Sequence, residues 1–147
     1  MLTGVNLGCF RDREAALNLA GLIRAAGAVE GLERLRLSSI EVNHVTRDLI
    51  DAMRETPIVS RHLHVPLQSG DDGVLRAMRR RYSAAQYQGK LEPLDDFNLT
   101  ADVIVGMGED PGLIVAGCKR AIDIGGYPFI GPLRPVPRPP SPWYPTM

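Results

Sequence analysis

Polar residues recur at the points where short apolar segments of this sequence end. The four groups are Thr3, Gly4 and Asn6; Ser38, Ser39 and Glu41; Gln68 and Ser69; and Asp102, Gly106 and Glu109. If the apolar segments are parallel strands, all four groups face one rim of the sheet, and ligands bind at that rim in α/β folds. The sequence therefore predicts one convergent polar site with hydrogen-bonding and acid–base groups.

A simpler alternative applies to each position taken alone. Serine, asparagine and aspartate often occur at such points only as helix caps and turn residues. This alternative explains the four groups together less well, because Asn6 and Gln68 are not needed for capping.

The segments that must position these residues alternate between strands and helices, which predicts parallel strands joined by right-handed crossovers. Residues 1–134 are expected to form one core domain, followed by a proline-rich, extended tail over residues 135–147. The expected strands are Leu2–Val5, Arg34–Ser38, His62–Leu67, Leu99–Val105 and Tyr127–Leu133, and the expected helices are Arg13–Ala26, Thr46–Glu55, a short helix capped by Asp71 or Asp72 that runs to Met78, Ala84–Leu94, and Pro111 to about Ile124.

Composition excludes several classes of protein. A chain of 147 residues with 44% hydrophobic content can build one real core, and its zero net charge gives no support for a nucleic-acid or membrane partner. Its two cysteines, Cys9 and Cys118, are too few to bind an iron–sulfur cluster and form no disulfide framework. No apolar run could span a bilayer and no signal peptide is recognisable, so a cytoplasmic location is expected.

The sequence carries one dense basic patch, which includes Arg76, Arg79 and Arg80. At helical spacing these three residues are expected to lie solvated on one face of a helix. They either offset the dipole at the end of that helix or contact RNA phosphates, and both interpretations stay open.

Residues Leu2–Val105 resemble the radical S-adenosylmethionine (SAM) methylthiotransferases, in particular the subgroup that acts on threonylcarbamoyladenosine in tRNA. The motifs that carry this resemblance are Thr3-Gly-Val-Asn-Leu-Gly8, Leu35-Arg-Leu-Ser-Ser-Ile-Glu41, the block from His62 to Tyr82, and Thr100-Ala-Asp-Val-Ile-Val-Gly106. Their length and order make chance agreement very unlikely.

The resemblance implies an α/β fold, namely an incomplete (β/α) radical SAM partial barrel of about five parallel strands with strand one missing. It implies SAM as cofactor and tRNA as partner. On the RNA-contact interpretation of the basic patch, Arg76, Arg79 and Arg80 are the candidate RNA-binding residues. The full-length family also uses a [4Fe–4S] cluster, which this chain is not expected to bind. The SAM-binding residues that the resemblance implies are Gly4, Asn6, Ser38, Glu41, Gln68, Ser69, Ile104, Gly106 and Glu109.

The sequence departs from the family after the predicted strand Leu99–Val105. There the sequence has Met107-Gly-Glu-Asp110, whereas the family usually has Phe-Pro-Gly-Glu. From this point the sequence becomes more similar to biotin-synthase-like radical SAM proteins. The leading interpretation is a truncated methylthiotransferase core, inactive alone, whose exposed sheet edge favours self-association. A biotin-synthase-like enzyme acting on a small molecule and a non-catalytic α/β fragment that binds a nucleotide or a partner remain as alternatives. A natural fragment, a truncated gene and a join of two related sequences also stay open.

Overall fold

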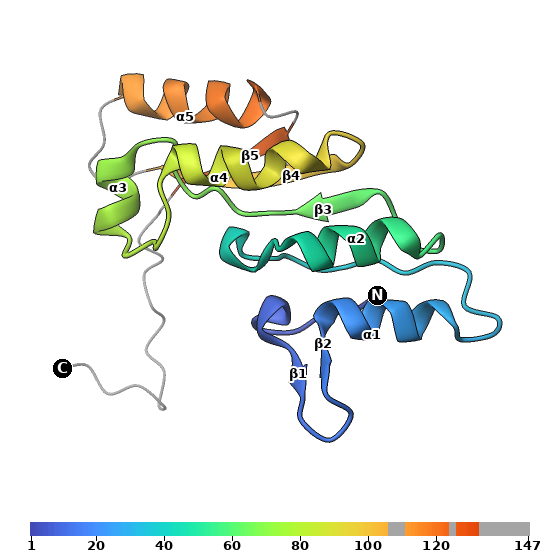
Figure 1. Cartoon of the computed structure of the whole chain (residues 1–147). Helices are drawn as coiled ribbons and strands as arrows, with labels where there is room; N and C mark the ends of the chain where they lie inside the picture. The colour runs from blue at the N-terminus through green and yellow to red at the C-terminus, as the bar shows by residue number, and fades with distance from the viewer. Residues whose placement is uncertain (106–110, 124–125, 133–147) are drawn as a thin grey trace, which may run out of the picture.

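The computed structural model describes residues 1–105, 111–123 and 126–132, and its fold is mixed α/β (Figure 1). A short antiparallel hairpin pairs β1 (Arg11–Asp12) with β2 (Leu17–Asn18), and a parallel sheet has the order β3 (His62–His64), β4 (Asn98–Val105) and β5 (Gly126–Pro132). The α-helices are α1 (Leu19–Gly27), α2 (Arg47–Glu55), α3 (Asp72–Ala77), α4 (Ala84–Leu91) and α5 (Pro111–Asp123), and 3-10 turns lie at Leu7–Cys9, Val42–His44 and Glu92–Leu94. Among the described residues, no helix is long and apolar enough to cross a membrane.

Parallel pairing continues beyond the three-stranded sheet through single bridges. Leu2 pairs with Leu37 and Leu35 pairs with Val59, both in parallel. The segment 34–38 thus pairs in parallel with the chain just before β3, as the predicted parallel order requires, although residues 2–5 and 34–38 form bridges and not full strands. No closed barrel is present within the described ranges, where the sheets are short.

Alternation along β4 separates a buried face of the sheet from a polar one. Leu99, Ala101 and Val103 are buried, whereas Thr100 and Asp102 stay partly exposed on the other face. The buried residues belong to one continuous apolar cluster, which also contains residues of β3 and of helices α1, α2 and α4. The helices therefore cover one face of the sheet, and the polar residues of β4 line the opposite face.

Capping side chains set the beginnings of three helices, and Thr46, predicted as the first helical residue, is the cap of α2. Thr46 accepts a hydrogen bond from the backbone N–H of Leu49, and Asp71 accepts one from Val74. Ser83 and Gln86 form a reciprocal capping box at the start of α4. Each cap satisfies a backbone donor that the first turn of a helix leaves free.

The predicted helix Arg13–Ala26 is wrong over its first six residues, because α1 begins only at Leu19. The carboxylate of Asp12 accepts hydrogen bonds from the backbone N–H groups of Glu14 and Ala15, which closes a turn between β1 and β2. Ala16 then takes a left-handed φ of 51°. Short polar side chains compete in this way with helical hydrogen bonding, and here the turn prevails.

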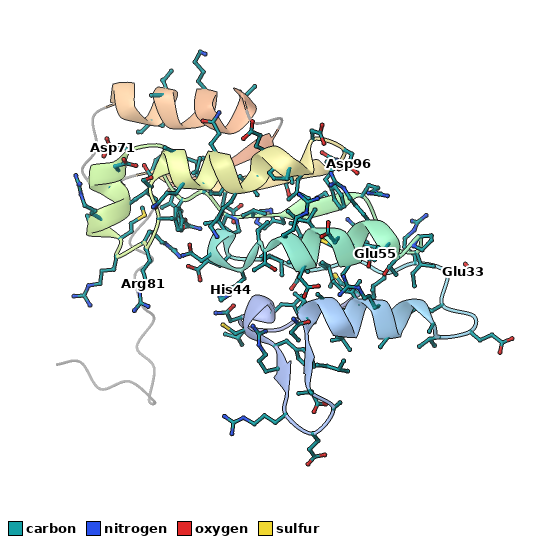
Figure 2. All side chains as sticks on the ribbon, viewed as in Figure 1. Glu33, His44, Glu55, Asp71, Arg81 and Asp96 are labelled. Atoms are coloured by element: carbon teal, nitrogen blue, oxygen red, sulfur yellow. The ribbon has the colours of Figure 1, made fainter. Side chains whose placement is uncertain are left out.

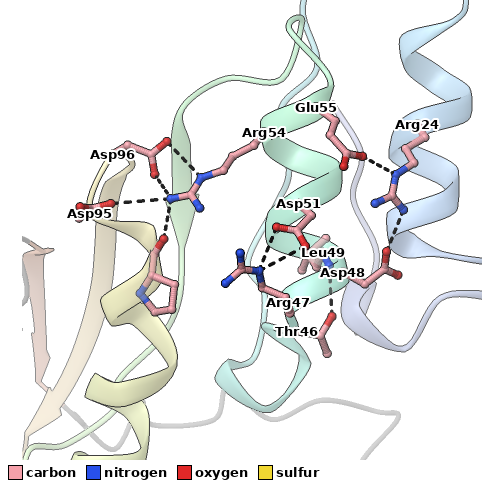
Figure 3. Close-up of polar contacts among 11 residues, drawn as sticks. Arg24, Thr46, Arg47, Asp48, Leu49, Asp51, Arg54, Glu55, Asp95 and Asp96 are labelled. Carbon is pink, nitrogen blue, oxygen red and sulfur yellow. Dashed lines mark hydrogen bonds and ion pairs between the residues drawn. The ribbon is translucent and has the colours of Figure 1, made fainter.

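Charged side chains on neighbouring elements pair across the surface (Figure 3). Arg24 of α1 contacts Asp48 at 2.8 Å and Glu55 at 2.9 Å, both on α2. Arg54 of α2 contacts Asp96 at 2.6 Å, just before β4. These exposed pairs join α1 to α2 and α2 to the segment before β4, and each contributes little stability.

Gly70→Ala is expected to destabilise the protein, because a Cβ at Gly70 would clash with the backbone Cα atom of Gly117 in α5. Overpacking of this kind costs about 1–3 kcal/mol. The matched control is Gly89→Ala in α4, where a Cβ meets nothing within 4 Å. That change should stabilise the helix by about 0.5–1 kcal/mol. Denaturant unfolding of both variants checks the pair, and a neutral Gly70→Ala would contradict the close approach of α5.

Candidate functional site

An open pocket of about 210 Å³ lies beside the carboxyl end of β3 and the segments that run parallel to it. It is lined by Val5, Asn6, Ser39, Glu41, Pro66, Gln68, Arg80 and Tyr82. Three of the predicted SAM-binding residues, Asn6, Glu41 and Gln68, are thus brought together. Gly4, Ser38, Ser69 and Ile104 do not line the pocket, and Gly106 and Glu109 lie outside the described residues.

Gln68 occupies a conformation that residues other than glycine rarely adopt. Its φ is 71°, and the residue is only 7% exposed. Its backbone N–H donates to the carbonyl of Asp102, and its carbonyl accepts from the N–H of Ile104, each at 2.8 Å. Left-handed backbone of this kind persists where surrounding contacts enforce it, and such residues cluster at functional sites.

Several polar atoms in and beside the pocket are buried without a partner. Ser38 Oγ, Gln68 Oε1 and Arg80 Nε have no hydrogen bond within the described parts of the chain. Most buried polar groups in proteins are paired, so each exception calls for an explanation, and an absent ligand is one. Gln68 and Arg80 both line the pocket, which makes it the candidate binding site.

Asn6 and Ser69 separate the capping alternative from the ligand-binding one. Asn6 precedes the turn Leu7–Cys9, but its side chain makes no capping hydrogen bond, so it stays available in the pocket. Ser69 Oγ accepts a hydrogen bond from the backbone N–H of Asp71 and lies outside the pocket lining. Turn formation therefore explains Ser69, whereas it leaves Asn6 unexplained.

Two buried tyrosines bond to the segment that leads into the pocket, which Tyr82 also lines, and neither role was predicted from the sequence. The Tyr82 hydroxyl donates to the carbonyl of Leu67 at 3.1 Å, and the Tyr87 hydroxyl donates to the carbonyl of Val65 at 2.6 Å. Burial raises the pKa of Tyr82 to about 12 and raises the pKa of Tyr87 as well. Both phenols are therefore neutral donors at pH 7 that hold the end of the β3 segment in place.

The predicted placement of the arginines on one helical face is wrong. Helix α3 ends at Ala77, and Arg79 follows with a left-handed φ of 57°. The N–H of Arg80 then bonds to the carbonyl of Leu75, and the N–H of Arg79 bonds to that of Arg76, which is the Schellman pattern of a helix end. Arg76 and Arg79 remain exposed as expected, but Arg80 turns into the pocket and is half-buried.

A chain of polar contacts crosses the open face of β3 and β4. Thr100 Oγ1 lies 3.2 Å from His62 Nε2 and 2.8 Å from His64 Nδ1, and His64 Nε2 lies 3.3 Å from Asp102 Oδ2. Desolvation, followed by the charges of Arg36 and His64, lowers the pKa of His62. In the ranges that the structure describes, no group of three His, Cys, Asp or Glu residues could hold a metal ion.

The two cysteines lie on separate elements. Cys9 is exposed, with its Sγ atom 3.3 Å from Nε2 of His44, whereas Cys118 lies in α5. Figure 2 shows His44 beside the amino-terminal segment of the chain. Within the described residues, Cys9 therefore has no second cysteine on its own element with which it could share a metal.

Comparison with curated proteins finds close relatives over most of the chain. A protein of Clavibacter michiganensis is 50% identical over 101 residues, which is 66% of this chain and 19% of the relative. Proteins of Salinispora arenicola and Corynebacterium urealyticum are 44% and 48% identical over 119 and 118 residues, each covering 78% of this chain and 22% and 21% of the relative. All three are named tRNA-2-methylthio-N(6)-dimethylallyladenosine synthase.

The chain spans about a fifth of the length of these relatives. Their names specify dimethylallyladenosine, whereas the sequence motifs suggested the threonylcarbamoyladenosine subgroup. A search against protein-family models finds no match.

Stability is expected to fall as the pH rises from about 10 toward 12. An unfolded tyrosine ionises near pH 10, whereas folding holds the pKa of Tyr82 at about 12. Because the pKa of Tyr82 is higher in the folded state than in the unfolded state, its contribution to stability is complete below about pH 10. That contribution is lost as the pH rises toward the folded pKa. Tyr82→Phe should therefore flatten the pH dependence and, by removing the bond to Leu67, cost about 0.5–1.5 kcal/mol at pH 7. Urea unfolding of both proteins at several pH values tests this, and an unchanged slope in the variant would refute it.

Proposed function

Because this chain belongs to the tRNA methylthiotransferase family, we propose that it forms the SAM-binding part of an enzyme that adds a methylthio group to a modified adenosine of tRNA. The observation that carries the proposal is the meeting of Asn6, Glu41 and Gln68 in one pocket at the carboxyl ends of parallel segments. On this proposal the parallel segments are part of a radical SAM partial barrel.

The pocket residues fit a ligand such as SAM. Gln68 Oε1 is a buried acceptor without a partner, and Asn6 and Glu41 add an amide and a carboxylate to the same lining. SAM carries an ammonium, hydroxyl groups and an adenine that can use such groups. When bound, SAM supplies the methyl group and, in this family, the source of the radical. Gly4, Ser38, Ser69, Ile104, Gly106 and Glu109 remain proposed to contribute to the same site.

An iron–sulfur cluster does not fit these residues. The family's cluster needs three or more thiolates, and the 147 residues hold only Cys9 and Cys118, on separate elements. The radical step would need ligands that this chain does not supply, so we propose that the chain is inactive alone. Its own residues bind and orient the cofactor.

The relatives' names favour tRNA over a small molecule as the substrate. They also favour dimethylallyladenosine over threonylcarbamoyladenosine as the modified base. Arg76 and Arg79 are exposed and remain candidates for phosphate contacts, whereas Arg80 belongs to the pocket. We propose a cytoplasmic location on the same ground, since the relatives are named for modification of tRNA.

Binding of SAM to the full 147-residue chain tests the proposed cofactor. Titration calorimetry should show saturable binding, and Asn6→Ala should weaken it about three- to tenfold, since one hydrogen bond contributes about 0.5–1.5 kcal/mol. Asn98→Ala is the matched control, because Asn98 is exposed at the amino end of β4 and should leave the affinity unchanged. No saturable binding, or equal loss in both variants, would reject the pocket as the SAM site.

The salt dependence of tRNA binding tests whether Arg76 and Arg79 contact the phosphates of a tRNA partner. Each lost phosphate contact reduces the slope of log K against log salt by about 0.7–0.9, so an Arg76→Ala, Arg79→Ala double variant should lower it by roughly 1.5. An Arg13→Ala, Arg34→Ala double variant removes the same charge from exposed positions elsewhere and should keep the slope of the parent. Identical slopes in the three proteins would return Arg76 and Arg79 to the role of helix-end charges.

A further inference from the structure

A cysteine and a histidine outside the candidate binding pocket lie within hydrogen-bonding distance of each other (Figure 2). The Sγ atom of Cys9 is 3.3 Å from Nε2 of His44, and Cys9 is exposed whereas His44 is half-buried. Proteins activate cysteine nucleophiles by placing an imidazole beside the thiol, because the imidazole takes the thiol proton. The pair therefore combines an accessible nucleophile with a base in reach of it.

Two short 3-10 turns hold the pair together across 35 positions of sequence. In the first turn, the N–H of Cys9 donates to the carbonyl of Asn6 at 3.0 Å. In the second turn, the N–H of His44 donates to the carbonyl of Glu41 at 2.8 Å. Gly8 lets the two turns approach, because a Cβ atom at Gly8 would clash with the side chain of His44. The imidazole is thus fixed against the turn that carries the thiol.

A small cavity of about 50 Å³ lies beside this pair. It is lined by Gly8, Arg11, His44 and residues from the first turns of α1 and α2. The backbone N–H groups at the start of a helix favour a negative charge nearby. Arg11 donates to the carbonyl of Phe10, and no carboxylate pairs with it among the described residues, so the cavity also has a guanidinium charge available.

Asp48 lines the same cavity, but its negative charge is already engaged. Its carboxylate accepts hydrogen bonds from Arg24 at 2.8 Å and from Asn18 at 3.1 Å, and the bond to Arg24 lowers the pKa of Asp48. The cavity therefore favours a further small anion. Its volume has room for a carboxylate group and is far below the 300–1,000 Å³ or so that a whole organic ligand occupies.

We propose that Cys9 is a site of reversible modification, at which it forms a mixed disulfide with a small thiol that carries a carboxylate. His44 Nε2 accepts the thiol proton, and the Cys9 sulfur attacks a small disulfide, R–S–S–R. The Cys9–S–S–R bond forms as the original S–S bond breaks, and the leaving thiolate takes the proton from His44 and departs as R–SH. The Cys9 sulfur is oxidised and the leaving sulfur is reduced. The carboxylate of the attached group lies in the cavity beside Arg11.

Cys118 provides a contrast within the same chain. It lies half-buried in α5 and packs against the apolar core, an environment in which a thiol is unreactive. This inference is independent of the proposed function, because neither Cys9 nor His44 lines the candidate binding pocket.

The test measures how fast oxidised glutathione modifies each cysteine of the full chain, by mass spectrometry of the intact protein and of its cysteine peptides. At pH 7, Cys9 should react at least about tenfold faster than Cys118. His44→Gln should slow the reaction of Cys9 about tenfold at pH 7. It should leave that rate unchanged at pH 10, because an unaided cysteine thiol ionises near pH 8.5 and needs no base there.

The charge of the disulfide tests the cavity. Oxidised glutathione carries carboxylates, whereas cystamine carries ammonium groups and no carboxylate. Arg11→Gln should slow the reaction of Cys9 with oxidised glutathione about two- to fivefold, the effect of one exposed charge, and should not slow the reaction with cystamine. Arg13→Gln is the matched control, because Arg13 is exposed on the same hairpin but does not line the cavity, and it should keep the rate of the parent.

Three results would overturn the proposal: a Cys9 that reacts no faster than Cys118, a His44→Gln variant with the rate of the parent at pH 7, and equal effects of Arg11→Gln and Arg13→Gln. Cys118 also monitors folding, since a variant that unfolds would expose it and speed its reaction. If His44→Gln does so, the parent decides. An unaided thiol reacts roughly thirtyfold faster at pH 10 than at pH 7, so a ratio of that size for Cys9 contradicts the proposal and a much smaller one supports it.

Discussion

The left-handed backbone of Gln68, clamped by two hydrogen bonds to β4, is the constraint on which the rest of the site depends. It ends the path of β3 and directs the chain into Gly70, which packs against Gly117 of α5. The turn then delivers Asp71 as the cap of α3. Because α3 in turn leads to Arg80 and Tyr82, one enforced φ value sets the position of half of the pocket.

The site is locally unfavourable, and this agrees with a binding role. Gln68 Oε1 and Arg80 Nε are buried without partners in the described structure, and each such group opposes folding. The apolar cluster and the hydrogen bonds of the Tyr82 and Tyr87 hydroxyls compensate for this cost. Groups left unsatisfied by the fold are available to a ligand, which recovers the energy when it binds.

The sequence predicted those elements whose ends carry a local chemical signal. Thr46, Asp71 and Ser83 cap three helices whose beginnings the sequence placed within one residue or so, and the alternation from Leu99 to Val105 predicts β4. It missed the β1–β2 hairpin because the apolar spacing after Arg13 is helical, whereas the Asp12 turn depends on hydrogen bonds that spacing does not encode.

The meeting of Asn6, Glu41 and Gln68 followed from parallel strand order, which is a property of the whole pattern. The position of Arg80 could not be foreseen in the same way. Helix α3 stops because Arg79 takes a left-handed φ, and a non-glycine residue gives no sequence signal for that conformation. The hydrogen bonds from Tyr82 and Tyr87 to the carbonyls of Leu67 and Val65 depend on tertiary packing, which no local sequence pattern encodes.

The polar chain on the open face of β3 and β4 has a defined direction. With Asp102 ionised, Nε2 of His64 must carry a hydrogen to donate, so its Nδ1 is a lone pair that accepts from the Thr100 hydroxyl. The Thr100 oxygen then accepts from Nε2 of His62. One carboxylate charge thus favours one tautomer in each of two imidazoles, and the single hydroxyl hydrogen of Thr100 passes that preference from His64 to His62.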